Sequence, residues 1–162
     1  MPSQLDQARL LVPAAQKLAA SAYSPLTQQY PELAVIIQDA SDNRWEFFFV
    51  IASIGVALLL APVQVEAEVQ SQVCDAVEGA LETWRPQGYL ALKDFFEFVR
   101  RHQDGKVEMP AAIGAWVVLN LKQAKPSEEE IALAWPLGLF FLHSFKDWWN
   151  LTSETDASDD NS

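Results

Sequence analysis

The stretch FFFVIASIGVALLLAPV, residues 47–63, contains no charged residue and decides how the rest of the chain is interpreted. A helix of these 17 residues would be about 26 Å long, slightly shorter than a hydrocarbon layer of roughly 30 Å. A helix that is enclosed by other helices is also apolar on all sides. Ser53, Ala57 and Ala61 form a small-residue seam along it, which allows close packing in a soluble or a membrane bundle. We expect residues 47–61 to be the central helix of a soluble bundle, with a lipid-facing helix as the alternative.

The remaining sequence favours helices and contains few strand signals. Long period-two alternation is missing, and apolar residues recur at steps of three and four instead. We predict an all-α fold, a single-domain bundle of about six to eight helices over residues 1–151. Residues 152–162 are acidic and polar and have little to bury, which predicts a disordered acidic C-terminal tail.

Prolines predict where the first helices end, because proline lacks an N–H and clashes with the preceding turn. An Ala-rich helix over residues 3–22 should be bent or divided at Pro13. Ser24-Pro25 and Tyr30-Pro31 should then break the chain before a short helix at 32–38.

Two amphipathic helices are predicted in the middle of the chain. Pro62 should open a helix over residues 62–84, and one buried face is indicated by Val69, Val73, Val77, Ala80, Leu81 and Trp84. A second helix over 86–102 should end at Gly105, with a core face of Leu92, Phe95, Phe96 and Val99.

The clearest local signal is the segment Pro126-Ser127-Glu128-Glu129-Glu130. Ser127 and Glu130 have the spacing of a capping box, in which each side chain bonds to the other residue's backbone N–H. Pro136 should kink or split the helix that follows. That helix should present Ile131, Trp135, Phe141, Phe145 and Trp148 as its apolar residues.

An offset of 64 residues aligns Pro62 with Pro126 and Trp84 with Trp148, with apolar positions matching between them. The alignment predicts two similar helical hairpins, over about 45–84 and 109–148, joined by the helix near 86–102. A true duplication and the chance register of two amphipathic helices both explain it.

The charge balance limits the classes of partner. Asp and Glu outnumber Lys and Arg by 22 to 11, for a net charge of −11. Nucleic acids and anionic lipids are bound mainly through Lys and Arg, so we expect neither direct nucleic-acid binding nor membrane attachment. The acidity would instead steer a basic partner toward the protein. The first residues lack a secretory-signal pattern, which favours a cytoplasmic location.

Few residues could carry catalytic chemistry. Cys74 is the only cysteine and lies among apolar and acidic neighbours, which predicts a buried small residue. His102 is expected to act as a cation at a helix C-terminus, and His143 to lie at a helix edge, bonded to a neighbour such as Asp147. No nucleophile elbow or phosphate-binding glycine loop occurs. We predict no catalytic, cofactor or metal site and no enzymatic activity.

One helix face is a candidate for partner binding. At helical spacing one side of residues 62–84 carries Glu68, Gln72, Asp75, Gly79 and Glu82, with Glu78 adjacent. These residues are interpreted either as an ordinary solvated face or as a docking strip for a basic protein surface. Nearby cations could neutralise part of it within the fold: Arg85, Lys93, Arg100, Arg101 and Lys106.

Tryptophan is abundant for a chain of this size, with six residues, and is enriched in binding hot spots. Trp148 and Trp149 are consecutive and would point about 100° apart on a helix, so one of them should be exposed or lie against a partner. We therefore expect a helical protein that binds another protein, as an adaptor, inhibitor, immunity-type protein or assembly factor. The alternative is a carrier of an apolar ligand, or a protein that touches the membrane through its central helix.

Overall fold

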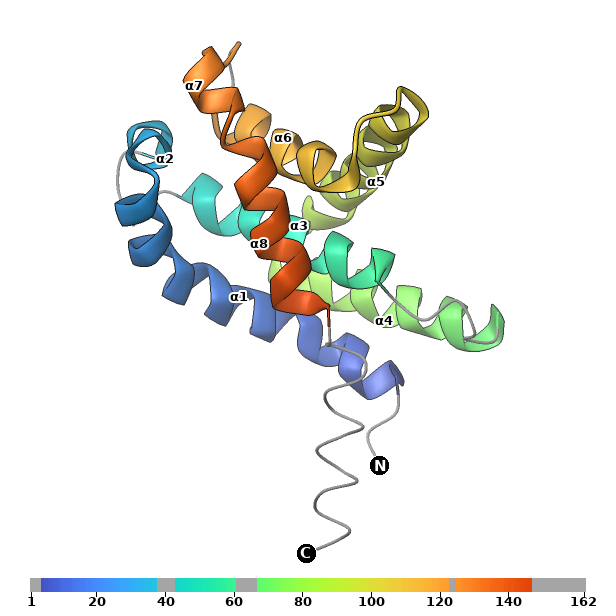
Figure 1. Cartoon of the computed structure of the whole chain (residues 1–162). Helices are drawn as coiled ribbons and strands as arrows, with labels where there is room; N and C mark the ends of the chain where they lie inside the picture. The colour runs from blue at the N-terminus through green and yellow to red at the C-terminus, as the bar shows by residue number, and fades with distance from the viewer. Residues whose placement is uncertain (1–3, 38–42, 61–66, 123–124, 147–162) are drawn as a thin grey trace, which may run out of the picture.

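The computed structural model describes residues 4–37, 43–60, 67–122 and 125–146. These residues form eight helices and no strand, which confirms the all-α prediction (Figure 1). The helices are α1 (Gln4–Gln29), α2 (Pro31–Ile37), α3 (Asn43–Leu59), α4 (Ala67–Trp84), α5 (Gly88–Asp104), α6 (Met109–Lys122), α7 (Glu128–Ile131) and α8 (Ala134–Phe145). The predicted tail at 152–162 and the predicted helix start at Pro62 lie outside the described residues.

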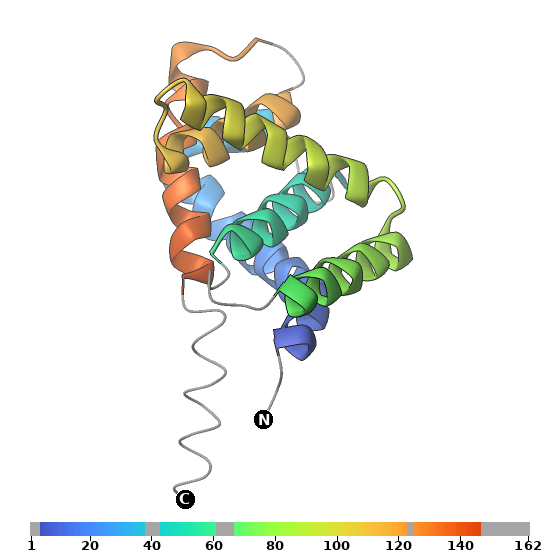
Figure 2. The same cartoon turned by 90° about the vertical axis from the view of Figure 1, so that its right-hand side faces the viewer.

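Helix α3 is the centre of the bundle, as its uniformly apolar sequence predicted. Every residue from Phe49 to Ala57 is buried. The helices packed around α3 are α1, α5, α6 and α8 (Figures 1 and 2). The buried Ser53 hydroxyl donates to the carbonyl oxygen of Phe49 at 2.8 Å, so this polar group keeps a hydrogen bond in the core. Among the described helices, none combines the length and the apolar character that crossing a membrane requires.

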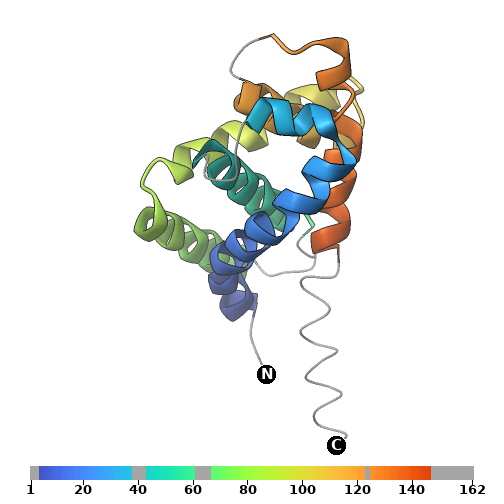
Figure 3. The same ribbon diagram turned by 90° about the vertical axis from the view of Figure 1, so that its left-hand side faces the viewer.

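Helix α1 shows that the chain is not divided at Pro13 and does not break at Pro25, so these two expectations were wrong. It runs unbroken from Gln4 to Gln29 with Pro13 and Pro25 inside it, and the chain breaks only before Pro31 (Figures 1 and 3). A proline in a helix interior destabilises the helix by about 3 kcal/mol, because it removes a backbone hydrogen bond and clashes with the preceding turn. The apolar stripe of α1 continues past Pro25 and is buried at Ala8, Leu11, Val12, Ala15, Ala19, Ala22 and Leu26. Packing of this stripe against α3 and α4 offsets the cost.

Trp45 ties α3 to α1. Its side chain is buried, and its indole Nε1 donates to the carbonyl oxygen of Ala19 at 3.0 Å. A buried indole stabilises a fold when its N–H finds such an acceptor. This bond therefore joins the first turn of α3 to the middle of α1.

Helices α6 and α8 form an antiparallel pair in direct backbone contact. Gly114 faces the carbonyl group of Ala134, and Gly138 faces that of Pro110. A Cβ atom at either glycine would overlap the facing carbonyl oxygen. The predicted hairpin over 109–148 is therefore confirmed for the described part of that range. The close approach of α6 to α8 depends on Gly114 and Gly138, which have no side chains.

The predicted matching hairpin over 45–84 is wrong in its packing. Helix α4 packs mainly against α1 and α5, and the backbones of α3 and α4 do not pack closely along their length. They meet through large side chains, as where the rings of Phe47 and Trp84 stack at 5.9 Å. The two hairpins therefore differ in their packing.

The capping box at Ser127 is confirmed. The Ser127 Oγ accepts from the Glu130 N–H at 3.1 Å, and the Glu130 carboxylate accepts from the Ser127 N–H at 2.9 Å. Lys122 Nζ lies 3.0 Å from the other oxygen of Glu130. The backbone bond from Ser127 and the bond from Lys122 lower the pKa of Glu130 below its ordinary value of 4.5.

The predicted split near Pro136 is confirmed, but the predicted apolar face is wrong at two positions. Helix α7 ends at Ile131 and α8 starts at Ala134, so Pro136 lies in the first turn of α8, where an N–H is not needed. Ile131 and Trp135 are 39% and 44% exposed. The break between α7 and α8 separates Ile131 from α8, and Trp135 lies about 120° around α8 from the buried Phe141. The predicted positions Phe141 and Phe145 are buried, together with Leu133, Ala134, Leu137 and Gly138.

Helix α5 ends as predicted at Gly105, but the residue with unusual backbone geometry is its neighbour. Lys106 has a φ of 68°, in the left-handed region that favours glycine. The Lys106 N–H donates to Gln103 and the Val107 N–H donates to His102, a Schellman motif that satisfies the last carbonyl groups.

Candidate functional site

Helix α4 presents two faces of opposite character, as its sequence predicted. Val73, Val77 and Leu81 are buried. The residues on the opposite face, Gln72, Asp75, Gly79 and Glu82, are all exposed. The side chain of Glu68, which was predicted to belong to the same face, lies outside the described residues. We call the four described residues Gln72, Asp75, Gly79 and Glu82 the α4 strip.

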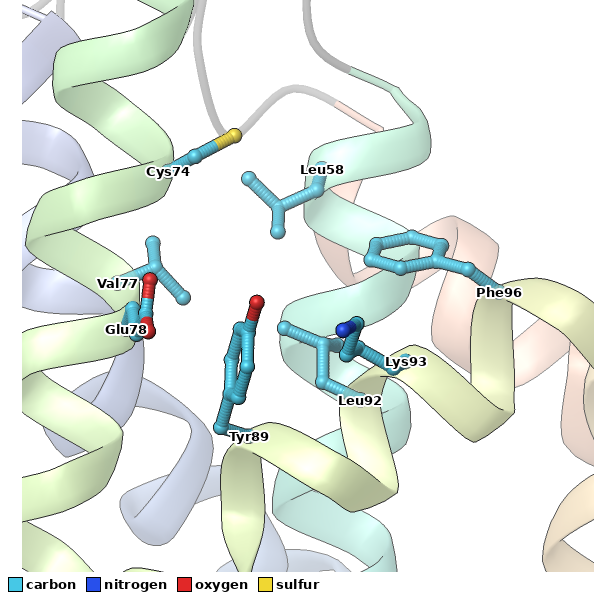
Figure 4. A pocket seen from close by; sticks show the side chains of 8 residues that line it. All are labelled: Leu58, Cys74, Val77, Glu78, Tyr89, Leu92, Lys93 and Phe96. Carbon is cyan, nitrogen blue, oxygen red and sulfur yellow. The ribbon is translucent and has the colours of Figure 1, made fainter.

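Glu78 departs from the predicted arrangement, because it is half-buried and turns toward α5. It lines an open pocket of about 200 Å³ between α3, α4 and α5 (Figure 4). The pocket residues are Leu58 from α3, Cys74, Val77 and Glu78 from α4, and Tyr89, Leu92, Lys93 and Phe96 from α5.

The lining of this pocket divides into an apolar part and a polar part. The apolar side chains come from all three helices: Leu58, Val77, Leu92 and Phe96. The polar groups are the Cys74 thiol, the Glu78 carboxylate, the Tyr89 hydroxyl and the Lys93 amine. Figure 4 shows the Tyr89 hydroxyl pointing into the space between the helices and the Cys74 sulfur facing Leu58. A pocket with apolar walls and a few polar groups is the usual form of a binding site.

Cys74 corrects the prediction of a buried small residue. Its side chain is exposed and reaches the solvent beside the pocket. The buried stripe of α4 is centred on Val73 and Val77, and consecutive helical residues point about 100° apart. The position next to Val73 therefore turns away from the core.

A corner of aromatic and ionic contacts holds α3, α4 and α5 together. The Arg85 guanidinium lies 4.9 Å from the ring centroid of Trp84 and 3.2 Å from a Glu46 oxygen. Gly88 opens α5 against Leu81 and Ile51, where a Cβ atom would lie 3.2 Å and 3.4 Å from their side chains. These contacts join α3 to the end of α4 and the start of α5, and so position the walls of the pocket.

Further along α5, a second glycine contact brings it against α3. The ring of the buried Phe95 covers Gly55, and a Cβ atom at Gly55 would overlap that ring. The Trp116 indole N–H donates to Asp94 Oδ2 at 3.0 Å and ties α6 to the same helix. Helix α5 is therefore fixed on both sides of the pocket residues Leu92 and Lys93.

The cations near the α4 strip form no ion pair with Asp75 or Glu82 among the described residues, so the neutralisation considered from the sequence is not seen there. Arg85 pairs with Glu46, and Arg101 lies 3.8 Å from Glu97. Lys93 lies 5.1 Å from the Tyr89 ring centroid. Within the parts of the chain that the structure describes, no ion pair involves Asp75, Glu78 or Glu82. The strip therefore keeps its negative charge toward solvent.

The two histidines lie on different helices, His102 on α5 and His143 on α8. The ring of His102 stacks on Phe98 at 4.0 Å, and its Nδ1 lies 2.9 Å from the Phe98 carbonyl oxygen, in the last turn of α5. His143 is exposed on α8, and its predicted neighbour Asp147 lies outside the described residues. Over residues 4–37, 43–60, 67–122 and 125–146, no three His, Cys, Asp or Glu residues form a group that could hold a metal ion.

The structure tests the predicted exposure of the tryptophans only in part. Trp148 and Trp149 lie outside the described residues, so the expectation for them stays a prediction. Trp45 and Trp116 are buried, and Trp135 is the exposed tryptophan among those described. Trp135 was predicted to lie on an apolar face, but it lies about 120° around α8 from the buried Phe141 and is exposed.

The pocket itself was not predicted. Its residues come from three helices, and only the approach of these helices in space brings Leu58 near Tyr89 and Phe96. Periodicity gave Phe96 a core position and gave Tyr89 no role. Comparison with protein-family models, with curated proteins and with solved structures finds no match. The function proposed next therefore rests on the geometry of the described residues.

Proposed function

We propose that this chain is a non-enzymatic cytoplasmic protein that binds another protein through the α4 strip and the neighbouring pocket. The observation that carries the proposal is the position of Asp75 and Glu82. Both are exposed on one helix, neither takes part in an ion pair within the described residues, and an open apolar pocket lies beside them. An adaptor, an inhibitor, an immunity-type protein and an assembly factor would all use such a surface.

Electrostatics determines the kind of partner. The net charge of −11 repels acidic surfaces and attracts basic ones over a distance set by the ionic strength. Exposed charges at an interface increase the association rate more than the final affinity. We therefore propose a partner whose contact surface is rich in Lys and Arg, bound at a rate that falls as salt is added.

The dimensions of the pocket favour this proposal over an apolar-ligand carrier. Pockets for cofactors and drug-sized ligands occupy roughly 300–1,000 Å³. The pocket between α3, α4 and α5 occupies about 200 Å³ and is open to solvent. The membrane alternative depended on the central helix, which is covered by other helices from Phe49 to Ala57.

Charge reversal tests the proposal. The double variant Asp75→Lys/Glu82→Lys reverses the charge of the strip from negative to positive. Asp104→Lys/Glu108→Lys changes the net charge equally at two other exposed positions and serves as the matched control. The tagged native chain and both variants would be used to isolate bound proteins from the native host, and the association rate of a recovered partner would be measured at several salt concentrations.

We expect the partner to be recovered with the native chain and with the control but not with the strip variant. Added salt should lower the partner's association rate with the native chain and with the strip variant by different factors. We expect the factor for the native chain to be at least tenfold larger. Equal recovery with all three chains, or a rate that is insensitive to salt, would contradict the proposal.

A further inference from the structure

We infer that the pocket between α3, α4 and α5 receives one uncharged apolar side chain of the partner, of about the size of leucine or phenylalanine. Lys or Arg residues that flank this anchor would then face Asp75 and Glu82. This inference rests on the proposed function, since the anchor belongs to the same basic partner. It adds a chemical specificity that the strip alone would not give.

The size and lining of the pocket indicate the anchor. An enclosed apolar cavity of 150 Å³ holds a molecule as large as benzene. The present pocket is about 200 Å³ and is walled by four apolar side chains, Leu58, Val77, Leu92 and Phe96. A single large apolar side chain would replace water against these walls, and such central anchors provide much of the affinity of protein interfaces.

The charged groups of the pocket indicate that the anchor is neutral. Glu78 and Lys93 line the same pocket with opposite charge. A charged side chain between them would meet one attractive and one repulsive group while losing its hydration, and such desolvation is costly. The Cys74 thiol and the Tyr89 hydroxyl add only weak or neutral polar groups.

The geometry of α4 places the flanking charges. Asp75 directly follows Cys74 at the pocket, and Glu82 lies one turn beyond Glu78. Asp75 and Glu82 are two helical turns apart, roughly 10 Å. Cations on either side of the anchor would reach Asp75 and Glu82. They would lie two or three residues from the anchor in an extended segment, or one turn from it in a helix.

One arm of the test uses small probes on the isolated protein. N-acetyl-leucinamide, N-acetyl-alaninamide and N-acetyl-lysinamide would be added at millimolar concentration, with backbone amide NMR shifts as the readout. We expect saturable shifts at Val77, Leu92 and Phe96 with the leucine probe, and shifts at least tenfold weaker at equal concentration with the other two. Cys74→Trp should block these shifts because it places an indole at the pocket mouth, whereas Cys74→Ala should keep them. Position 74 is exposed, so both variants should keep the native fold.

The other arm uses two peptides that differ only at the anchor, Ac-KKGKLKGKK-NH2 and Ac-KKGKAKGKK-NH2. We expect the leucine peptide to bind the native chain about tenfold more tightly, a ratio that falls to about one in Cys74→Trp. In Asp75→Lys/Glu82→Lys both peptides should weaken by a similar factor, leaving the ratio near ten.

The outcomes separate the inference from the proposed function. If neither peptide binds, the proposed function fails, and the small probes still show whether the pocket takes an apolar group. If the leucine probe gives no saturable shifts, or shifts Cys74→Trp as much as the native chain, the inference of an apolar anchor is overturned. The same holds if both peptides bind the native chain equally well.

Discussion

Replacing Gly114 by alanine should destabilise the protein strongly, although alanine is the better helix former. Gly114 lies in the middle of α6, and its Cα faces the backbone carbonyl group of Ala134 in α8. An added methyl group would overlap that oxygen. Because the obstacle is backbone and not the end of a flexible side chain, the two helices would have to separate by at least about 1 Å, which forfeits about half of the dispersion attraction between the atoms across the contact.

The magnitude follows from two opposing effects. Alanine gains about 1 kcal/mol over glycine in a helix interior. Overpacking a well-packed contact costs typically 1–3 kcal/mol and occasionally more, and a backbone overlap belongs at or above the top of that range. We expect a net loss of about 3 kcal/mol from a total stability of roughly 5–15 kcal/mol. For a chain of this length the thermal midpoint should fall by roughly 6–12 °C.

The assay is urea unfolding followed by far-UV circular dichroism and by tryptophan fluorescence. Gly79→Ala is the matched control, since it also adds one methyl group to a glycine inside a helix. Apart from its chain neighbours and the backbone of its own helix, nothing lies within 4 Å of the new Cβ position. The control should be stabilised by about 0.5–1 kcal/mol.

A second variant checks the reasoning further. Gly138→Ala should cost a similar amount, because its Cβ would overlap the Pro110 carbonyl group on the same helix pair. The double variant should cost less than the sum, since one separation of the helices relieves both overlaps. If Gly114→Ala were as stable as Gly79→Ala, the close contact of α6 and α8 would be refuted.

Three further predictions concern single contacts. Lys106→Gly should stabilise the protein by about 1 kcal/mol, because Lys106 has a left-handed backbone conformation that glycine adopts without strain. Chemical denaturation measures this gain. An unchanged or lower stability would contradict the left-handed conformation of Lys106. The lowered pKa of Glu130 means that its ionised form contributes stability above pH 4.5, which is lost as the pH falls through the lowered folded-state pKa. The difference in unfolding free energy between the native chain and Glu130→Gln should therefore be larger at pH 7 than at pH 3, and a difference independent of pH would exclude this linkage. Arg85→Ala should lower the free energy of unfolding by about 1–2 kcal/mol, because it loses the contacts with Trp84 and Glu46. The control Arg101→Ala loses only an exposed ion pair and should lower it by less than about 0.5 kcal/mol. Equal shifts of the thermal midpoint for the two variants would argue against the corner at Arg85.

Features that depend on a few neighbouring residues were predictable from the sequence. The capping box at Ser127 and Glu130 follows from side chains that reach backbone N–H groups within one turn. The end of α5 at Gly105 follows from the preference for glycine near helix C-termini. The charge-free run of residues 47–63 predicted the central helix, because a helix that is apolar on all sides is stabilised when other helices cover every side. The buried and exposed faces of α4 followed from helical spacing in the same way.

Three features were decided only by the tertiary structure: the continuity of α1, the close contact of α6 with α8, and the pocket. Each depends on contacts between residues that are far apart in the chain. The buried stripe of α1 carries the helix through Pro25 against its local preference, because packing on α3 and α4 outweighs the lost hydrogen bond. Gly114 and Gly138 gain their importance from the helix that each faces. The pocket between Leu58, Cys74 and Phe96 exists only because α3, α4 and α5 are held apart on one side and tied together at Arg85 on the other. Sequence spacing describes one helix at a time, whereas a binding surface is made by the distances between helices.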